Sequence, residues 1–358
     1  MNKKKVLIID DSALIREILT EVINSFNNFE VIDTAADPHI GANKIVKLNP
    51  DIVTLDIEMP IMDGLTFLEK LMRLRPIPVL IISSLSKANS DVALKSLELG
   101  AVDYVTKPSA HIVKILPELR EEIKSKLEIC AISKISRERI SRVEVEKKYS
   151  ADAVLPVKKN IISFQTTEKI IAIGASTGGT VALTKLLSML PGNMPGIVIV
   201  QHMPAGFTKA FATRLNCDTS LKVKEAEEND TIIAGHVLIA PGGQHLLVNR
   251  SGTRFFVKIN DGPTVNRHKP SVDVLFRSVA QSAGANSVGV ILTGMGDDGA
   301  LGMLEMKQVG SFNLAQNEAS SVVFGMPKVA IEKGGVDKVL SLEEIAKYLL
   351  NNYVTTHP

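Results

Sequence analysis

Short apolar runs and amphipathic stretches alternate along residues 4–108. The apolar runs indicate buried strands, and apolar positions recurring every three or four residues indicate helices. The predicted strands are Lys5–Ile9, Glu30–Thr34, Asp51–Leu55, Val79–Ile82 and Val102–Val105. The predicted helices are Ala13–Phe26, Ile40–Leu48, Gly64–Leu74 and Ser90–Leu99. This alternation predicts a parallel, doubly wound α/β sheet, in which functional side chains gather at the carboxyl ends of the strands.

The alternation resumes in the second half of the chain. The predicted strands there are Ile170–Ile173, Ile197–Val200, Val237–Ala240 and Val288–Leu292, with a more β-rich stretch over His245–Ile259. We therefore expect a second doubly wound α/β domain that carries a β-rich insertion.

The two halves are separated by a stretch of different composition. After a predicted helix over about Ile112–Ile129, residues 131–160 hold eight Lys or Arg, four Asp or Glu and no Gly. That composition is typical of a solvated linker. We predict one domain over residues 1–125, a linker over 126–165 and a second domain over 166–355. Composition leaves open whether the linker is a passive spacer or a hinge and tether.

Composition and charge exclude several classes of partner. The net charge is +2, and the chain has no Trp and only four Tyr, so we expect no nucleic-acid binding. No run approaches the roughly 18–20 apolar residues of a membrane span, and Met1–Asp10 is too polar for a secretory signal. Cys130 and Cys217 fit no metal-ligand spacing and indicate thiols in a reducing compartment. We expect a cytoplasmic protein that is not inserted in a membrane.

Charged and hydroxyl side chains stand at the carboxyl ends of the first domain's strands. Asp10 and Asp11 follow the first strand, Asp56 and Ser83 end the third and fourth, and Lys107 follows the fifth. Carboxylates gathered at one sheet edge repel each other, and Mg²⁺ prefers such oxygen ligands. An aspartate beside Mg²⁺, a lysine and a hydroxyl is suited to accept a phosphoryl group. Helix capping is the alternative for one acid alone, but it does not explain all five positions.

This first domain resembles the receiver domain of two-component response regulators over roughly residues 4–125. The matching positions are Asp10-Asp11, Asp56 to Gly64, Ser83 and Thr106-Lys107-Pro108. The resemblance implies a flavodoxin-like fold with a five-stranded parallel sheet.

The resemblance also implies roles for individual residues. Asp56 would be the phosphorylation site, Asp10, Asp11 and Asp56 would bind Mg²⁺, and Ser83 and Lys107 would sense the phosphoryl group. Tyr104 matches the rotating aromatic of the switch surface, although a buried strand aromatic fits the same position. The Lys107–Pro108 bond is a candidate for the cis form, which proline permits.

The second domain opens on a serine in a small-residue turn. Gly174-Ala175-Ser176-Thr177-Gly178 fits the G-x-S-x-G pattern between a predicted strand and an amphipathic segment. Such a turn exposes the hydroxyl beside a helix N-terminus, where backbone N–H groups can meet an anion. A dinucleotide site is the alternative, but it requires an acid about 20 residues on. From Lys169 to Cys217 there is no Asp or Glu, which favours a nucleophilic serine.

His202 is the leading candidate for a general base. It ends the strand that follows the serine's strand, and strands joined by a single helix are commonly neighbours in a sheet. His236 and His245 also flank strands and are weaker candidates.

An acid is needed to orient the imidazole of that base. Asp297 and Asp298 lie in a glycine-rich loop after the strand Val288–Leu292. Spacing does not choose between them, and either one could instead cap the helix that begins near Ala300. The resulting order Ser, His, Asp differs from the Ser, Asp or Glu, His order of α/β-hydrolases.

The second domain resembles the catalytic domain of the chemotaxis protein-glutamate methylesterases. The matching segments are Ile173 to Gly179, Gln201 to Thr208, Ala240 to Gly243, Pro270 to Asp273 and Leu292 to Gly299. The resemblance implies Ser176 as nucleophile, His202 as base and Asp298 as the orienting acid. Backbone N–H groups of Thr177 and of Met295 or Gly296 are the expected oxyanion donors.

The combined resemblance implies a phosphorylation-activated serine esterase. Its substrates would be methylated glutamates and glutamines of chemoreceptors, and its phosphoryl donor a chemotaxis histidine kinase. Mg²⁺ would serve the receiver, and no cofactor is expected for the esterase chemistry. Two alternatives stay open: a phosphorylation-dependent binding module without turnover, and a hydrolase of small esters.

Overall fold

The computed structural model describes residues 3–59, 64–83, 87–107, 112–133, 149–156 and 169–354. The chain divides into two compact units, Met1–Val143 and Glu144–Pro358. Pro108, and with it the bond considered for a cis form, lies outside the described residues, as do residues 60–63 of the segment that matches receivers.

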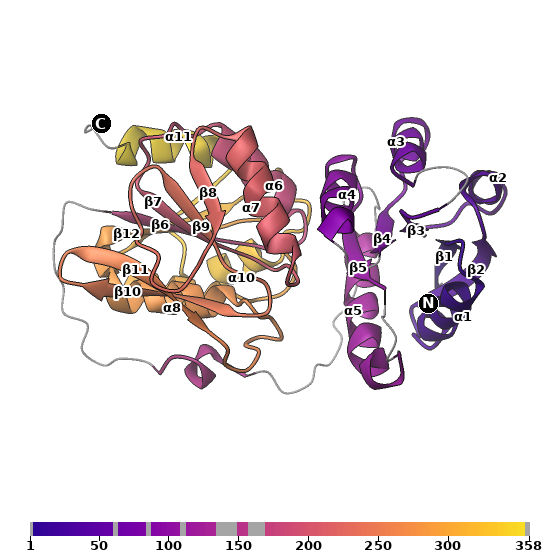
Figure 1. The fold of residues 1–358 in the computed structure, drawn as a ribbon, viewed down its shortest axis with the longest axis horizontal. Helices are drawn as coiled ribbons and strands as arrows, with labels where there is room; N and C mark the ends of the chain where they lie inside the picture. Colours follow the sequence, from indigo (N-terminus) through magenta and orange to yellow (C-terminus); the bar gives the residue numbers. More distant parts are fainter. Residues whose placement is uncertain are drawn as a thin grey trace. The chain divides into compact units, whose positions relative to one another are not determined.

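The first unit is built on a parallel sheet in the order β2-β1-β3-β4-β5 (Figure 1). Its strands are β1 (Lys4–Ile9), β2 (Phe29–Ala35), β3 (Ile52–Asp56), β4 (Val79–Ser83) and β5 (Asp103–Thr106). Its helices are α1 (Ala13–Asn24), α2 (Pro38–Leu48), α3 (Gly64–Leu74), α4 (Lys87–Glu98) and α5 (Ile112–Ile132). Every residue of β3 and β4 is buried, as expected for central strands covered on both faces. The predicted flavodoxin-like, five-stranded sheet is confirmed.

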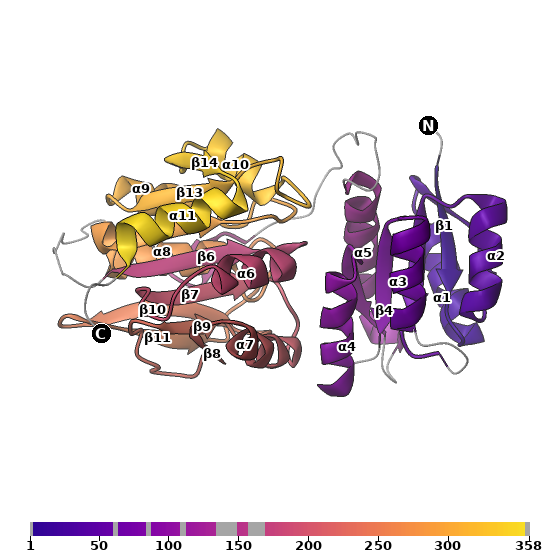
Figure 2. The ribbon, with the colours of Figure 1, turned by 90° about the horizontal axis from the view of Figure 1, so that it is seen from above.

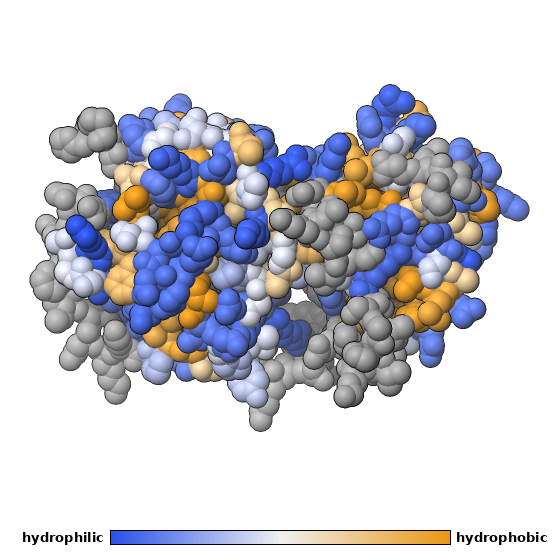
Figure 3. Space-filling model, viewed as in Figure 1, coloured by the Kyte–Doolittle hydropathy of each residue, from blue (hydrophilic) through white to orange (hydrophobic). Residues whose placement is uncertain are grey.

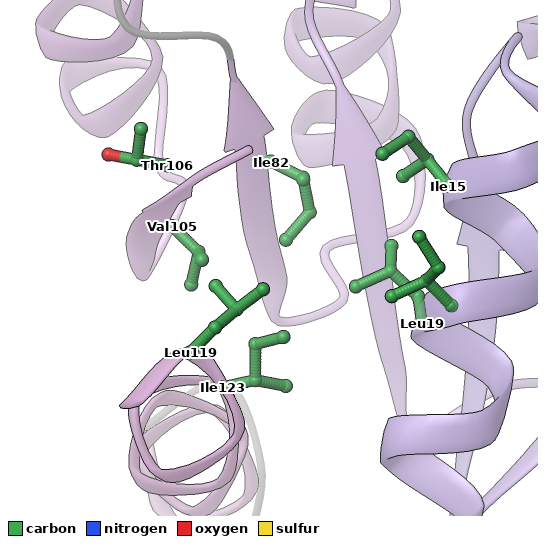
Figure 4. Close-up of a pocket in the computed structure, with 8 residues that line it drawn as sticks. Ile15, Leu19, Ile82, Val105, Thr106, Leu119 and Ile123 are labelled. Atoms are coloured by element: carbon green, nitrogen blue, oxygen red, sulfur yellow. The ribbon is translucent and has the colours of Figure 1, made fainter. Parts of the chain in front are cut away.

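Helices α1 and α5 pack against each other and against the sheet. Ile15 and Leu19 of α1 face Leu119 and Ile123 of α5 around a small apolar gap (Figure 4). Each pair is four residues apart and so lies on one face of its helix.

Helix α5 extends past the predicted end of the first domain. Residues 126–132, which the sequence analysis assigned to the linker, form its last turns. Leu127 and Cys130 are fully buried there, and Lys126 pairs with Glu122 one turn earlier at 3.3 Å. These contacts hold the last turns in the helix, so the linker begins later than predicted.

The second unit contains a parallel sheet in the order β14-β13-β12-β6-β7-β9-β8 (Figure 2). Its strands are β6 (Ile170–Ala175), β7 (Gly196–Gln201), β8 (Lys222–Glu225), β9 (His236–Ile239), β12 (Ser287–Ile291), β13 (Phe312–Gln316) and β14 (Lys338–Leu340). Strands β8, β13 and β14 were not predicted. Strand β8 is mostly charged, and β13 buries the polar side chains of Asn313 and Gln316, so neither shows a clear apolar run.

Helices cover both faces of this sheet. On one face, α6 (Gly179–Ser188) contacts both α7 (Phe207–Asp218) and α11 (Leu342–Tyr353). The others are α8 (Val272–Ser282), α9 (Ala300–Gln308) and α10 (Met326–Glu332), with short 3₁₀ turns at Ala151–Ala153 and Gly284–Asn286. The predicted β-rich insertion is an antiparallel hairpin, β10 (His245–Ser251) and β11 (Arg254–Asn260), which packs on α8.

Strand β6 lies between β12 and β7 and decides which loops meet. All residues of β6 and β7 are buried, and their last residues, Ala175 and Gln201, are paired. Gly174 of β6 pairs with Ile291 at the end of β12. Three loops therefore leave the same edge of the sheet side by side.

Hydrophilic side chains surround smaller hydrophobic areas on the face drawn in Figure 3. The apolar residues of the strands lie inside, which leaves the polar faces of the helices outside. Within the described ranges, no helix combines the length and apolarity needed to cross a membrane.

We predict that Gly174→Ala destabilises the second unit by about 1–3 kcal/mol, because a Cβ there would overpack the contact between β6 and α8. That atom would lie 2.2 Å from Val272 Cγ1. Calorimetry of the full chain should show the loss. The double variant Gly174→Ala/Val272→Ala should lose less than the sum of the two single changes, and simple additivity would contradict the contact.

Candidate active site and phosphoacceptor site

Ser176, His202 and Asp298 meet at the carboxyl edge of the second sheet. Ser176 directly follows β6, and His202 directly follows β7. The Ser176 Oγ atom lies 3.1 Å from His202 Nδ1, and His202 Nε2 lies 2.8 Å from Asp298 Oδ2. The imidazole is 8% exposed and the carboxylate 1%, so water has little access to the pair. The structure thus brings together the three residues that the sequence proposed as a triad.

The Asp298 carboxylate is bound at the N-terminus of α8. One oxygen accepts from the Ser271 hydroxyl at 2.8 Å, from Asn266 Nδ2 at 2.9 Å and from the Asp273 N–H at 3.2 Å. The other accepts from the Val272 N–H at 2.6 Å, besides His202. A helix N-terminus favours a bound anion, through its free N–H groups and its dipole.

Those bonds keep the Asp298 carboxylate charged. Burial alone would raise its pKa, but the hydrogen bond and charge of His202 outweigh burial and hold the pKa below its ordinary value. An ionised Asp298 accepts the Nε2 proton of His202. The Nδ1 atom is then left as an acceptor for the serine hydroxyl.

Asp297, the other candidate acid, is placed differently. Its carbonyl accepts from the Ala300 N–H at 3.1 Å, and its side chain is half-buried. Helix α9 begins after Gly299, which has no side chain to cap it. The Asp298 carboxylate is bound instead by His202 and the start of α8.

The turn at Ser176 is fixed on both sides by neighbouring strands. The Ser176 N–H donates to the Thr293 carbonyl at 3.0 Å, and Gln201 Nε2 donates to the Ser176 carbonyl at 3.0 Å. Gly178 caps α6 with a φ of 75°, and a Cβ there would lie 2.6 Å from Val322 Cβ. Both the backbone angle and the space therefore require glycine at this position.

The expected oxyanion donors lie on two adjacent loops. Thr177 follows the serine and is 6% exposed. Met295 and Gly296 lie in the loop after β12, the former half-buried and the latter exposed. A Cβ added to Gly296, which has a φ of 89°, would meet no atom within 4 Å, so the backbone is open to an approaching molecule there.

The two weaker histidine candidates lie away from Ser176. His245 is fully buried, donates from Nε2 to the Pro263 carbonyl at 2.9 Å and accepts from the Ser271 N–H at 3.2 Å. Burial lowers its pKa, which keeps the ring neutral in this structural role. His236 bonds the carbonyl of Ala234.

Two residues at the site were not predicted as functional. The His268 ring stacks on His202 with centroids 3.6 Å apart and an angle of 9° between the rings. Asn266 donates to Asp298. Both lie in an irregular loop without strand or helix periodicity, so the hydrophobic pattern did not point to them. Their position just before the Pro270 to Asp273 motif was the available hint.

In the first unit, three carboxylates and one lysine converge at the carboxyl edge of the sheet. One carboxylate oxygen from each of Asp10, Asp11 and Asp56 lies within 4.8 Å of the others. Lys107 Nζ lies 2.9 Å from Asp10 and 2.6 Å from Asp56. Three acids against one lysine leave excess negative charge, and their oxygen donors suit Mg²⁺. The residues present therefore fit the expected ion.

Burial shifts the pKa of the Asp56 carboxyl group. Burial, aided by the charge of Asp10, raises this pKa from 3.8 to about 6, against the opposing hydrogen bond and charge of Lys107. One Asp56 oxygen also accepts from the Glu58 N–H at 3.1 Å. A nearby cation would favour the ionised form of Asp56.

The other residues implied for phosphoryl sensing lie on the neighbouring strands. Ser83 is 2% exposed, and within the described residues its hydroxyl has no hydrogen-bond partner. Tyr104 is buried in β5, with Lys126 Nζ 4.7 Å from its ring centroid. A buried Tyr104 fits both interpretations that the sequence left open, a switch aromatic and a core aromatic.

Comparison with known proteins adds independent findings. Residues 171–349 match the family model of the CheB methylesterase, and residues 6–123 match the response regulator receiver domain. A protein-glutamate methylesterase/protein-glutamine glutaminase of Geobacter metallireducens is 55% identical over 96% of this chain and 94% of its own. A protein of the same name from Escherichia coli is 51% identical over 98% of this chain and 97% of its own.

The chain belongs to the protein-glutamate methylesterase/protein-glutamine glutaminase family. A solved structure supports the fold of the second unit: the Thermotoga maritima CheB methylesterase catalytic domain matches with a TM-score of 0.51 and 40% identity, over 52% of this chain and 99% of that one. The resemblance noted from the motifs is thereby confirmed at the level of the family.

We predict that Asp56→Asn stabilises the metal-free receiver unit at pH 7.5. Because the folded pKa is raised, the folded state binds more protons than the unfolded state between pH 4 and 6, so stability falls as the pH rises through this window. The variant avoids this loss, about 3 kcal/mol at most for a shift of that size.

Calorimetry at several pH values checks this prediction. The advantage of Asp56→Asn should vanish near pH 4, and Mg²⁺ should stabilise the wild type but not the variant. Asp37→Asn, which keeps a capping side chain at the start of α2, is the matched control. An Asp56→Asn variant less stable than the wild type at pH 7.5 would contradict the prediction.

Proposed function

We propose that Ser176, His202 and Asp298 are the catalytic triad of a chemoreceptor methylesterase and glutaminase. The observation that carries this proposal is the continuous chain of contacts, 3.1 Å from serine to histidine and 2.8 Å from histidine to aspartate. Nucleophile, base and orienting acid within hydrogen-bond reach are what acyl transfer by a serine requires.

In the proposed reaction, His202 Nδ1 takes the proton of the Ser176 hydroxyl as Oγ attacks the γ-carbonyl carbon of a methylated glutamate. The imidazolium that forms is stabilised by the charged Asp298. The proton then passes to the departing methoxide, and methanol leaves. Water, activated by the same nitrogen, hydrolyses the acyl-enzyme. The receptor side chain then leaves Ser176 as a glutamate carboxylate. With a glutamine substrate, ammonia leaves in place of methanol.

The negative charge that develops on the carbonyl oxygen needs donors. We assign them to the backbone N–H groups of Thr177 and of Met295 or Gly296, which lie on loops after the adjacent strands β6 and β12. One such donor is worth about 2.7–4 kcal/mol in a comparable enzyme.

We assign Asp56 as the phosphoacceptor that controls the esterase. When bound, Mg²⁺ held by Asp10, Asp11 and Asp56 would neutralise the phosphoryl oxygens. Lys107 already contacts Asp10 and Asp56, and the Ser83 hydroxyl lies at the end of the strand next to that of Asp56, where it can bond the new group. The phosphoryl donor would be a chemotaxis histidine kinase.

A cytoplasmic reaction agrees with the chemistry of the site. Both cysteines are free thiols, Cys130 buried and Cys217 exposed, as in proteins of a reducing compartment. We propose that the enzyme acts there on the parts of receptors that carry methylated glutamates.

Ser176→Ala should abolish methanol release from membranes that hold methylated chemoreceptors, because no other hydroxyl replaces the nucleophile. Ser188→Ala, at the exposed end of α6, the helix that follows the Ser176 turn, should keep wild-type turnover. Methanol release by Ser176→Ala near the wild-type rate would contradict the triad. A wild type that is folded but releases no methanol would favour a binding module, and fast turnover of small esters that ignores receptors would favour a small-ester hydrolase.

A small phosphodonor with Mg²⁺ should raise methanol release by the wild type and by Asp37→Asn, but not by Asp56→Asn, which lacks the acceptor carboxylate. The same membrane assay measures all three proteins. Normal activation of Asp56→Asn would overturn Asp56 as the controlling acceptor and would leave the esterase assignment intact.

A further inference from the structure

Residues 149–156, which the sequence placed in the linker, pack on the second unit. We call them the docked linker segment. Ala151 is 4% exposed and lies in an apolar cluster with Leu247, Val265 and Val274. Val154 and Leu155 pack against the same cluster. A stretch that composition describes as a solvated spacer is therefore part of the folded unit.

Polar contacts fix the docked linker segment to α8. Arg277 is 4% exposed and donates to Asp152 Oδ1 at 2.7 Å and to the Leu155 carbonyl at 3.1 Å. The rest of its guanidinium pairs with Glu305 of α9, at 2.6 Å for the shortest contact. Because the planar guanidinium of Arg277 bonds the docked linker segment and Glu305 at the same time, it holds the segment in one position.

The docked linker segment also contacts a tight turn beside the triad. Val265 and His268 exchange backbone hydrogen bonds of 3.0 and 2.8 Å around Asn266 and Arg267. Both central residues have positive φ, 49° and 72°, as in a type I′ turn. Asparagine tolerates this conformation, but arginine is strained in it and needs support from its surroundings.

Two contacts supply support from the docked linker segment. The Asn266 N–H donates to the Tyr149 carbonyl at 3.0 Å. Val265, at the base of the turn, packs in the cluster that contains Ala151. The docked linker segment thus holds the turn through one backbone hydrogen bond and one apolar contact.

The side chains of this turn reach the catalytic acid and base. The Asn266 amide donates one N–H to Asp298 at 2.9 Å and the other to Asp273 at 2.6 Å, bridging two buried carboxylates. His268 stacks on His202. The charge of Asp298 adds to burial in raising the pKa of Asp273, so an amide shared by both acids relieves their repulsion.

We propose that Asn266 is a positioning residue for the triad and that the docked linker segment holds it in place. Asn266 fixes the Asp298 carboxylate toward His202, and the segment stabilises the strained turn that presents Asn266. The docked linker segment then contributes to the activity of the esterase. This inference rests on the proposed function of the triad.

Asn266→Gly tests the side chain without adding backbone strain, because glycine accepts a positive φ. In the full chain, with phosphodonor and Mg²⁺, we expect kcat for methanol release to fall about 10- to 100-fold with little change in KM. The strongly downfield proton between His202 Nε2 and Asp298 should disappear from the NMR spectrum. Asn229→Gly, at an exposed asparagine that also has a positive φ, is the control for the backbone change and should behave as wild type.

Ala151→Asp tests the docked linker segment. A carboxylate forced into the apolar cluster should release the segment, lower kcat about tenfold and weaken the same NMR signal. Ala153→Asp makes the same substitution two residues on, at an exposed position, and should leave kcat and the signal unchanged. Melting temperatures of all variants establish that the second unit stays folded.

The outcomes separate this inference from the proposed function. If the wild type turns over and Asn266→Gly keeps kcat and the downfield proton, the positioning role is overturned while the triad stands. If Ala151→Asp alone keeps wild-type kcat, the support by the linker is overturned. Absence of turnover in the folded wild type, or wild-type turnover in Ser176→Ala, would instead sink the proposed function itself.

Discussion

The binding of the Asp298 carboxylate at the N-terminus of α8 is the constraint on which the proposed active site depends. A buried carboxylate is costly unless its charge is met by donors. Here Ser271, Asn266, two backbone N–H groups and His202 all donate to it. These donors come from three parts of the fold, the start of α8, the turn before it and the end of β7. Satisfying one charge therefore also fixes α8, the turn and the imidazole.

The order of the strands explains the orientation of the imidazole. Strand β6, which carries the serine, lies between β7 with the histidine and β12 with the acid's loop. The Nδ1 atom, nearer the histidine backbone, faces Ser176, which follows the adjacent strand β6. The Nε2 atom reaches Asp298 beyond it. This is the reverse of the nitrogen use in the chymotrypsin template, and it is compatible with the proposed roles of His202 as base and Asp298 as orienting acid.

The two sites use buried carboxylates in opposite ways. Asp298 receives enough donors to hold its pKa below the ordinary value, which suits a permanent anion beside a base that becomes charged. Asp56 has Lys107 and one backbone N–H, and its pKa is raised to about 6. A metal ion can compensate the negative charge that these few donors leave at Asp56. A carboxylate with so few donors agrees with a reactive rather than a structural role.

The sequence by itself determined the two α/β domains, the strand ends that carry chemistry and the serine, histidine and acidic loop, because apolar runs mark buried strands and parallel strands share an edge. It did not separate Asp297 from Asp298 by spacing, since both share one loop and only the fold decides which carboxylate meets α8. Tertiary structure alone placed Asn266 beside Asp298 and His268 beside His202, because an irregular turn has no periodicity from which its contacts could be predicted. It also showed that residues 149–156, which composition assigned to a spacer, pack in an apolar cluster of the second unit. The sequence did not reveal this, because a short segment with one alanine and a few apolar residues is recognised as buried only when its packing partners are known.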